Sequence, residues 1–501
     1  MRSLLAGEST LSIMPTGYGK TLCFQLPVHL GMKPAIVISP LVALMMDQVR
    51  SADAAKLRTD CINSAQSAER RRQALRNYID GKTDILYVSP ERLSDDMFLM
   101  GVLEFAKKKP ALIVVDEAHC VTDWGHDFRP DYLMINSFIK KLPGVVVLAQ
   151  TATASPKTRE EIMEAFGISK KNLFHGFKTH RDNLDIRVQH FDSKDAKDGA
   201  LQLFIKENRG PGLVYTTGIE TAEKLATKYQ RLGYAADFFH SARKTGDKSR
   251  ILEQFKRGEI EILFCTNAFG LGINIPGIRY VVHYRIPASF DQYVQEIGRA
   301  GRDGLPAVCA LYMLKADMGI QERFINETFP DGDKLSEKIG TMLTTFNKHG
   351  IKRLPKFGDD SNLNSVLERE LVSLGYLEII GEVMTSIDID APGKLRGKYV
   401  TEGNSVMIQD SADESGETDR DVIRKIYRMS FEGKLAVLGR SDPDMAFKII
   451  KSPISAPDME KIWERLDGIR AFKRTRLRDL QDFAALKTAN SRISEINRYF
   501  S

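Results

Sequence analysis

The sequence is poor in cysteine, has two tryptophans among its 501 residues and lacks any long apolar run. The five cysteines are scattered without a CxxC pair and none follows Cys309, which excludes a disulfide framework and favours a reducing compartment. No apolar stretch reaches the roughly 18 residues that a membrane span needs, and the first residues lack a signal-peptide pattern. We therefore expect a soluble intracellular protein without a membrane partner, in the cytoplasm or nucleoid of a bacterium or the nucleus of a eukaryote.

A strong charge of one sign is also missing. Lysine and arginine number 72 against 66 aspartates and glutamates, so the net charge is +6. This small excess is compatible with a polyanionic partner but is weak evidence for one. At 501 residues the chain is too long for a single core, and about three domains are expected.

Short β-branched runs alternate with helix-like segments up to about residue 315. The candidate strands are 35–38, 84–88, 112–115 and 145–148 in a first series, and 213–215, 260–265 and 280–283 in a second. Nearly continuous apolar strands separated by helices are typical of parallel sheets covered on both faces. The pattern predicts an α/β fold with two tandem parallel-sheet domains, over residues 1–178 and 179–316.

The alternation stops beyond this point. Helix-like segments at 335–346 and 364–374, followed by a strand at 376–380 and a turn, predict a winged-helix-like domain over residues 317–405. A small α/β packing module with solvated charges is the alternative. Residues 406–420 are acidic and predict a linker, and residues 421–501 predict a helical C-terminal region.

A glycine-rich stretch lies between the first strand-like run and a helix. It runs through Pro15, Thr16, Gly17, Tyr18, Gly19, Lys20 and Thr21. Backbone N–H groups of such a loop point at phosphate oxygens, Lys20 can reach the β- and γ-phosphates, and the Thr21 hydroxyl can ligate Mg²⁺. The stretch therefore predicts an ATP-binding loop, and a glycine-rich turn without a ligand is the alternative.

Two carboxylates, Asp116 and Glu117, end a strand that is apolar throughout. Ligands of open parallel sheets bind at the carboxyl edge of the strands. We expect Asp116 to join the Mg²⁺ shell and Glu117 to orient the attacking water. An Asp-Glu pair alone is common in protein sequences. It becomes informative here because it follows the phosphate loop at the distance expected within one domain.

The second series ends in a basic motif that contains Gln295, Arg299 and Arg302. Two arginines three apart share a face if the segment is helical, and across a cleft they can stabilise charge on a γ-phosphate as an arginine finger does. A solvated basic helix face is the alternative interpretation.

Flat side chains follow the acidic pair closely, namely Trp124, His126, Phe128 and Arg129. Aromatic and guanidinium planes stack on bases at about 1–3 kcal/mol each without base preference. The loop predicts contact with a nucleic-acid strand close to the Mg²⁺ carboxylates. The alternative is that Trp124 and Phe128 are core residues.

Taken together these motifs resemble the RecQ family of superfamily 2 DNA helicases. The matching segments, in order, are MPTGYGKT, SPLVALMMDQV, INS, YVSPERL, DEAHC, WGHDFRP, TATA, FHSA, TNAFGLGINIPGIRYVVHY and QEIGRAGRDGLP. They cover about residues 4 to 315, and WGHDFRP after DEAHC is the segment that separates this family from other helicases. The resemblance implies two RecA-like domains that close on ATP and Mg²⁺ and drive 3′→5′ translocation on single-stranded DNA with unwinding of duplex DNA, in repair or recombination.

The resemblance also implies roles for individual residues. Lys20, Thr21, Asp116 and Glu117 fall to ATP and Mg²⁺, with Gln295, Arg299 and Arg302 completing the site. Thr151 and Thr153 fall in the motif that couples hydrolysis to movement. Nucleotide contacts are further implied for Gly270 and Asn274, and DNA contacts for Ser39, Arg92, Trp124, His126, Phe128, Arg129 and His240.

The chain departs from the family pattern in three places. It begins too late to hold the glutamine-containing segment that grips adenine, which leaves a DNA-binding module with impaired ATP turnover as an alternative. Thr122 and Asp123 replace a Ser-Gln-like pair, and Asn490 stands where the first cysteine of a zinc module is expected. We expect a degenerate module without zinc, because tetrahedral Zn²⁺ sites need paired cysteine or histidine ligands. An RNA-directed motor remains a further alternative.

Overall fold

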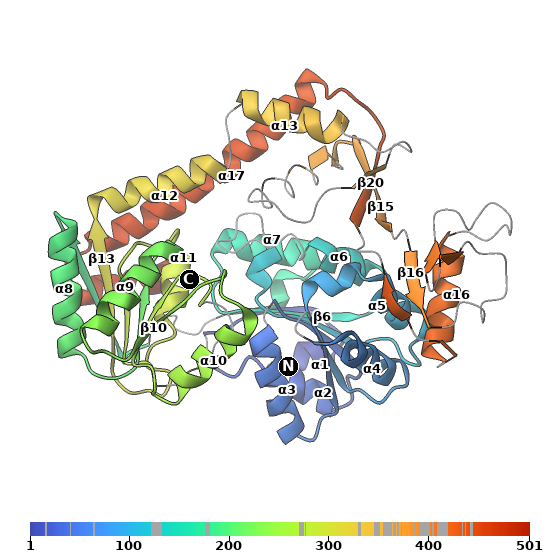
Figure 1. Cartoon of the computed structure of the whole chain (residues 1–501), viewed down its shortest axis with the longest axis horizontal. Helices are drawn as coiled ribbons and strands as arrows, with labels where there is room; N and C mark the ends of the chain where they lie inside the picture. Colours follow the sequence, from blue (N-terminus) through green and yellow to red (C-terminus); the bar gives the residue numbers. More distant parts are fainter. Residues whose placement is uncertain are drawn as a thin grey trace.

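The structure is a computed structural model of the chain (Figure 1). It describes residues 1–15, 18–40, 42–63, 66–121, 133–175, 181–269, 275, 277–328, 332–344, 351–353, 363, 367, 370–371, 373–383, 386–390, 401–402, 405–407, 419–432, 434–435, 437–440 and 444–500. Within these residues no helix is long and apolar enough to cross a membrane.

The first lobe is a seven-stranded parallel sheet. Its strands, in spatial order, are β3 (Thr59–Ile62), β4 (Ile85–Val88), β2 (Ala35–Ile38), β5 (Leu112–Val115), β6 (Val146–Thr151), β1 (Thr10–Ile13) and β7 (Leu173–Phe174). Its helices include α1 (Arg2–Leu5), α2 (Leu22–His29), α3 (Val42–Ala54), α4 (Ala68–Ile79), α5 (Asp96–Met100), α6 (Leu133–Lys140) and α7 (Pro156–Phe166). Ile36 and Ile38 pack on one face of the sheet and Ala35 and Val37 on the other, which explains why the strand is apolar throughout.

The second lobe is a six-stranded parallel sheet. Its strands are β10 (Ala236–Phe239), β11 (Ile262–Cys265), β9 (Gly212–Tyr215), β12 (Tyr280–His283), β13 (Ala307–Leu314) and β8 (Leu184–Phe191). Its helices are α8 (Lys194–Glu207), α9 (Ile219–Arg231), α10 (Thr245–Lys256), α11 (Phe290–Ile297) and α12 (Lys315–Thr328). Two tandem parallel-sheet lobes confirm the fold class expected from the sequence, and in the first lobe the glycine-rich loop directly follows the carboxyl end of β1.

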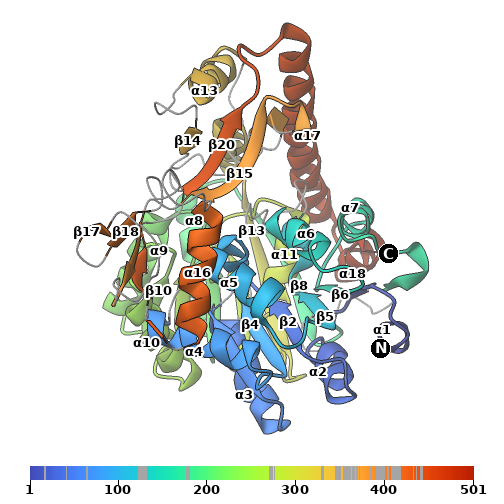
Figure 2. The same cartoon turned by 90° about the vertical axis from the view of Figure 1, so that its right-hand side faces the viewer.

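Two small antiparallel sheets follow the lobes. One contains β14 (Ile351–Arg353), β20 (Asp444–Ile449) and β15 (Leu377–Val383), and the other contains β17 (Thr401–Glu402), β18 (Ser405–Met407), β16 (Ser386–Ile389) and β19 (Val437–Arg440). Helix α13 (Gly332–Thr344) precedes them, and α16 (Asp419–Phe431) lies beside α5 of the first lobe (Figure 2). The expected linker at 406–420 overlaps β18 and the start of α16, and residues 408–418 lie outside the described residues.

Residues 421–501 are largely helical, as expected, but two strands interrupt this range. Strands β19 and β20 lie in this range, because their backbone groups pair with β16 and with β14 and β15 from far earlier in the chain. The winged-helix assignment of 317–405 stays a prediction. Gly375, expected to end a helix, has φ +71°, the left-handed conformation typical of that position.

A 30-residue helix, α17 (Ala456–Ala485), links these parts, and α18 (Ala489–Tyr499) follows it. Early in α17, Ile462 and Leu466 belong to the core that includes α13. Late in α17, Leu480 and Phe483 belong to the core of the second lobe. Figure 1 shows α17 running beside α12 from the second lobe to α13. At the far end, Arg159 of α7 donates to the carbonyl of Phe500, which ties the C-terminal helices to the first lobe as well.

Candidate nucleotide site between the two lobes

The glycine-rich loop joins β1 to α2. Gly19 has φ +85°, a conformation that glycine adopts without strain, and Lys20 follows it directly. The Lys20 carbonyl accepts a hydrogen bond from Gln150 Nε2 at 2.9 Å, so the neighbouring strand β6 holds the loop in place. Thr21 occupies the N-cap position of α2, and Tyr18 is 45% exposed. Lys20 and Thr21 therefore lie where the loop meets the positive end of a helix.

The two carboxylates lie against this loop. Glu117 Oε1 is 3.9 Å from Lys20 Nζ, and Asp116 Oδ1 accepts from the Glu117 N–H at 3.1 Å. Glu117 has φ +49°, an uncommon conformation for a residue with a side chain, and such backbone strain is frequent at functional sites. Gln48 of α3 donates to Asp116 Oδ2 at 3.5 Å. The structure thus brings the sequence-predicted lysine and acids together.

Burial gives Asp116 an unusual proton affinity. Loss of water around this carboxylate, and then the negative charge of Glu117, raise its pKa to about 6, although Lys20 acts in the opposite direction. A divalent cation would offset both causes, because it stabilises a buried pair of carboxylates. The donor set is also right for Mg²⁺, which prefers one or two carboxylates together with phosphate oxygens and water.

His119 connects the acids to the strand β6. Its Nδ1 lies 2.8 Å from Thr151 Oγ1 and 3.5 Å from Glu117 Oε2. Thr151 Oγ1 in turn donates to the Thr153 carbonyl at 3.0 Å. The two threonines predicted to couple hydrolysis to movement therefore contact the acidic pair through a histidine that the sequence analysis did not single out. Its position within DEAHC was the available signal. Gln48 and Gln150 were also missed, because nothing local marks them.

The two arginines of the second lobe differ from the prediction in one respect. Helix α11 ends at Ile297, so Gln295 lies on the helix, whereas Arg299 and Arg302 lie in the turns after it. The expectation of two arginines on one helix face is wrong. The reason lies in two glycines: Gly298 is the C-cap, and Gly301 has φ +55°, which takes the chain out of the helical direction.

The two arginines nevertheless interact electrostatically with each other, and Arg302 also interacts with Glu117 of the first lobe. Burial, followed by the positive charges of Arg299 and Arg181, lowers the pKa of Arg302 to about 9, and the Glu117 carboxylate of the first lobe opposes this shift. Arg302 is thus within electrostatic reach of the acidic pair. Arg299 is 3% exposed, and its Nε and Nη1 have no hydrogen-bond partner among the described residues. Buried guanidinium donors without acceptors are costly, and phosphate oxygens would satisfy them.

Three of the residues expected to contact DNA lie within the described part of the chain, namely Ser39, Arg92 and His240. Ser39 follows β2 and is buried, and Arg92 lies in the 3₁₀ helix η1 (Pro90–Ser94) with Nη1 3.8 Å from Asp95 Oδ2, so both occupy the carboxyl edge of the first sheet. His240 follows β10 but is 4% exposed, contacts Glu223 at 3.0 Å and stacks on Phe238. Several predicted residues lie outside the described residues: Thr16, Gly17, Trp124, His126, Phe128, Arg129, Gly270 and Asn274.

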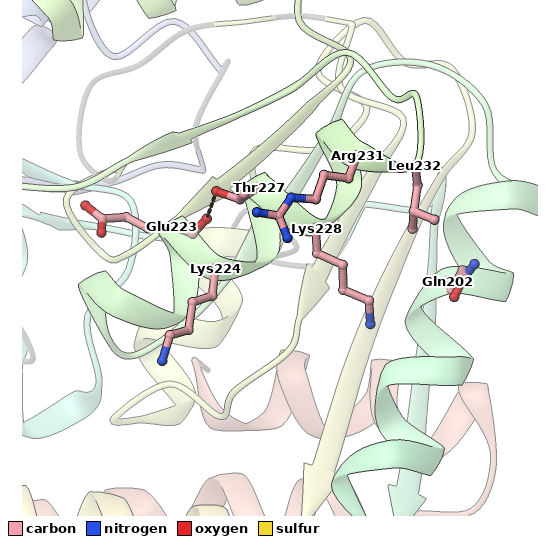
Figure 3. A pocket seen from close by; sticks show the side chains of 7 residues that line it. All are labelled: Gln202, Glu223, Lys224, Thr227, Lys228, Arg231 and Leu232. Carbon is pink, nitrogen blue, oxygen red and sulfur yellow. Dashed lines mark hydrogen bonds between the residues drawn. The ribbon is translucent and has the colours of Figure 1, made fainter.

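A surface hollow of about 590 Å³ lies elsewhere on the second lobe (Figure 3). Its lining comes from α8 and α9 and comprises Gln202, Glu223, Lys224, Thr227, Lys228, Arg231 and Leu232. None of these is a predicted site residue. Lys224 and Lys228 have acidic neighbours at 2.5 and 3.6 Å, so the hollow is not a concentrated positive site.

Comparisons with known proteins agree with this geometry. The family model of the DEAD/DEAH box helicase matches residues 1–162, and that of the helicase conserved C-terminal domain matches residues 196–304. In the solved structures, yeast Dbp5 bound to RNA and ADP BeF3 superposes with a TM-score of 0.52 at 18% identity over 64% of this chain and 83% of that chain. At that identity the likeness concerns the fold alone.

Curated relatives are closer in sequence. The probable ATP-dependent DNA helicase RecS of Bacillus subtilis is 36% identical over 69% of this chain and 69% of its own length. The ATP-dependent DNA helicases RecQ of Haemophilus influenzae and Bacillus subtilis are 31% and 34% identical, over 75% and 73% of this chain. The chain spans 57% and 58% of those two relatives, less than two thirds of their length. Two parallel-sheet lobes, their nucleotide motifs and this degree of identity together show that the chain belongs to the RecQ family of ATP-dependent DNA helicases.

Proposed function

We propose that the chain is an ATP-dependent 3′→5′ DNA helicase that couples hydrolysis to translocation on single-stranded DNA and to duplex unwinding, in DNA repair or recombination. The observation that carries this proposal is the meeting of two lobes at one site. Lys20 and Glu117 of the first lobe lie 3.9 Å apart, and Arg302 of the second lobe is close enough for Glu117 to affect its pKa. A site built from both lobes can respond to their relative movement, which a translocating motor requires.

Each residue of the site has a distinct proposed task. Lys20 and the loop residues Pro15 to Thr21 hold the phosphates, with further contacts from Gly270 and Asn274. Thr21 and Asp116 hold Mg²⁺, which neutralises phosphate charge when bound. Glu117 orients the attacking water, because it is the acid beside Lys20 and its Oε2 accepts no hydrogen bond from the residues that the structure describes. Arg299 and Arg302 stabilise the charge that develops during transfer, and Gln295 completes the site.

We assign DNA contact to Ser39, Arg92 and His240, which follow strands of the two sheets. We assign it also to the loop residues Trp124, His126, Phe128 and Arg129. Thr151 contacts Glu117 through His119, and we assign the coupling of DNA binding to hydrolysis to Thr151 and Thr153. Strand occupancy would thereby reach Glu117 through a short connection of buried groups. Duplex DNA is assigned to the winged-helix-like region 317–405.

ATP hydrolysis measured alone, with single-stranded DNA and with RNA tests the proposal, with Lys20→Ala as the inactive control. Stimulation by DNA is expected. Stimulation by RNA alone would support an RNA-directed motor, and the absence of turnover in every case would support a DNA-binding module. Unwinding of duplexes with a 3′ or a 5′ overhang tests the direction, and only the 3′ overhang is expected to support it.

Metal content is a separate test of the C-terminal region. We propose that the α17–α18 pair holds its place by packing and ion pairs rather than by zinc. Elemental analysis of the purified protein is expected to find less than about 0.1 zinc per chain, and one tightly held zinc per chain would contradict the proposal.

A further inference from the structure

Tyr215 ends the strand β9 and is 3% exposed. Its hydroxyl donates to the carbonyl of Phe269 at 2.7 Å. Phe269 follows β11 and is itself fully buried. One phenolic oxygen thus ties the end of a central strand to the segment that follows the neighbouring strand.

The same oxygen lies beside Arg299. Burial raises the pKa of Tyr215 well above its usual range, and the positive charge of Arg299 and a side-chain hydrogen bond from it act in the opposite direction. The hydroxyl can serve both neighbours, because a phenol donates one hydrogen bond and accepts others. Within the described part of the chain, Arg299 Nε and Nη1 have no hydrogen-bond partner, so this contact restrains the guanidinium while two donor groups stay available.

The tyrosine ring is itself held rigidly. It stacks on His283 with ring centres 5.2 Å apart and planes 13° apart. His283 Nε2 lies 2.7 Å from Glu296 Oε2, and Glu296 Oε1 accepts from Gln292 Nε2 at 3.0 Å. Glu296 and Gln292 both belong to α11, the helix that leads into the arginine turn. The ring and the arginine are therefore anchored to the same element.

We propose that Tyr215 is a positioning residue for ATP hydrolysis, whose hydroxyl holds the Arg299 guanidinium in the orientation that meets the transferred phosphate. This inference rests on the proposed function, because it requires Arg299 to act on the nucleotide. Two geometric observations support it. The buried hydroxyl has a fixed donor direction toward Phe269, and the ring stacks on His283, which contacts Glu296 of α11. A guanidinium without this neighbour samples more rotamers, and transition-state contacts weaken when their donors lose orientation.

Tyr215→Phe is the sharpest variant, because it removes one oxygen and leaves the stacked ring. The expected result is a loss of about tenfold in kcat for DNA-stimulated ATP hydrolysis with a change of less than about threefold in KM for ATP. Tyr229→Phe is the matched control. Its hydroxyl is also buried, finds no hydrogen-bond partner in the described structure and belongs to the core on the opposite face of the sheet, so the kcat of this variant should stay at the wild-type value.

A double-mutant cycle separates positioning from a general structural effect. In the Arg299→Ala background, Tyr215→Phe should lower kcat by no more than about twofold, because the group that it positions is absent. ATP-analogue affinity of both tyrosine variants should match the wild type, whereas the melting temperature of Tyr215→Phe should fall slightly, because the Phe269 carbonyl loses its buried donor. Equal losses from Tyr215→Phe in the presence and absence of Arg299 would overturn the inference, and so would a parallel loss of melting temperature and ATP affinity.

The cycle also distinguishes failure of the inference from failure of the proposed function. If Arg299→Ala is impaired and Tyr215→Phe hydrolyses ATP at the wild-type rate, only the role of Tyr215 is wrong. If Arg299→Ala hydrolyses ATP normally, the proposed role of the arginine turn is wrong, and the inference about Tyr215 is overturned with it.

Discussion

Arg476 of α17 and Asp291 of α11 form a buried ion pair between the C-terminal helix and the second lobe. Arg476 Nε donates to Asp291 Oδ2 at 2.9 Å, and the Tyr499 hydroxyl donates to the same oxygen at 2.9 Å. The two charged side chains are 5% and 2% exposed. Asp291 lies four residues before Gln295 on the helix that leads to Arg299, so the C-terminal helices brace the element that carries the arginine turn.

Arg476→Ala should destabilise the second lobe strongly. The substitution leaves the Asp291 carboxylate buried without its cation, and breaking a buried pair in this way costs about 3–5 kcal/mol. Arg478→Ala, two residues along the same helix at an exposed position, is the control and should change stability by less than about 0.5 kcal/mol. Thermal melting and denaturant titration measure both. Similar losses in the two variants would show that the ion pair does not brace the helix.

Gly301→Ala should distort the arginine turn. Gly301 has φ +55°, and an added Cβ would lie 2.5 Å from Asn183 Nδ2 and 2.8 Å from the Leu305 carbonyl oxygen. We expect a destabilisation of about 1–3 kcal/mol and a loss of ATP hydrolysis, because both arginines flank this position. Gly199→Ala in α8 is the control, since an added Cβ meets no atom within 4 Å and the helix gains propensity. Equal activity of the two variants would contradict the prediction.

Glu117→Gln should separate binding from hydrolysis. The amide keeps the size of the side chain but cannot take up a proton from water, so kcat should fall by a factor of about 10²–10⁴ while ATP affinity changes little. Steady-state hydrolysis and a fluorescent-nucleotide titration measure the two quantities. Glu207→Gln, at the exposed end of α8, should behave as the wild type. A normal rate for Glu117→Gln would exclude its proposed role.

Trp124→Ala should retain nucleotide binding and lose most of the stimulation by single-stranded DNA. The expected cause is loss of base stacking, worth about 1–3 kcal/mol. The ratio of ATPase rates with and without DNA is the measurement. Normal stimulation of the variant would mean that Trp124 does not sense the strand.

Asp84→Asn should remove a pH-dependent contribution to the stability of the first lobe. Hydrogen bonds from Arg58, at 2.8 Å and 3.1 Å, are the largest cause that lowers the pKa of Asp84 to about 2. A depressed carboxylate pKa stabilises the fold above the unfolded pKa of about 4, and this contribution is lost as pH falls toward 2. Since Arg58 and Lys33 are about half exposed, we expect a loss of only about 1 kcal/mol at pH 7.

Melting temperatures of the wild type and Asp84→Asn test this pH dependence. The gap between them should be largest near pH 7 and shrink as pH is lowered below about 4. A gap that widens on acidification would contradict the sign of the prediction.

Much of the secondary structure of each lobe can be predicted from short sequence segments. The strands expected at 35–38 and 112–115 are β2 and β5 residue for residue, because an apolar run buried on both faces is a local pattern that helix periodicity does not produce. The loop before Lys20 and the acids after β5 are likewise placed by what surrounds them in sequence. Parallel strands align their carboxyl ends, so these two motifs meet once the sheet forms.

Contacts between distant segments were decided by the tertiary structure. Asp291 and Arg476 are 185 residues apart, and no periodicity indicates that they pair. Residues 437–440 and 444–449 are strands because β16 and β15 offer backbone partners. A prediction from the local sequence cannot include these partners, because they lie far earlier in the chain.

Two glycines illustrate the same division within the site. The spacing of Arg299 and Arg302 was interpreted as one helical face, whereas Gly298 and Gly301 turn the chain out of the helix, and the charge of Glu117 acts on Arg302 from the first lobe. The sequence by itself determined which residues can bind a nucleotide, since their chemistry and flanking strands are local. The tertiary structure decided how they face one another, because orientation depends on where separate chain segments pack.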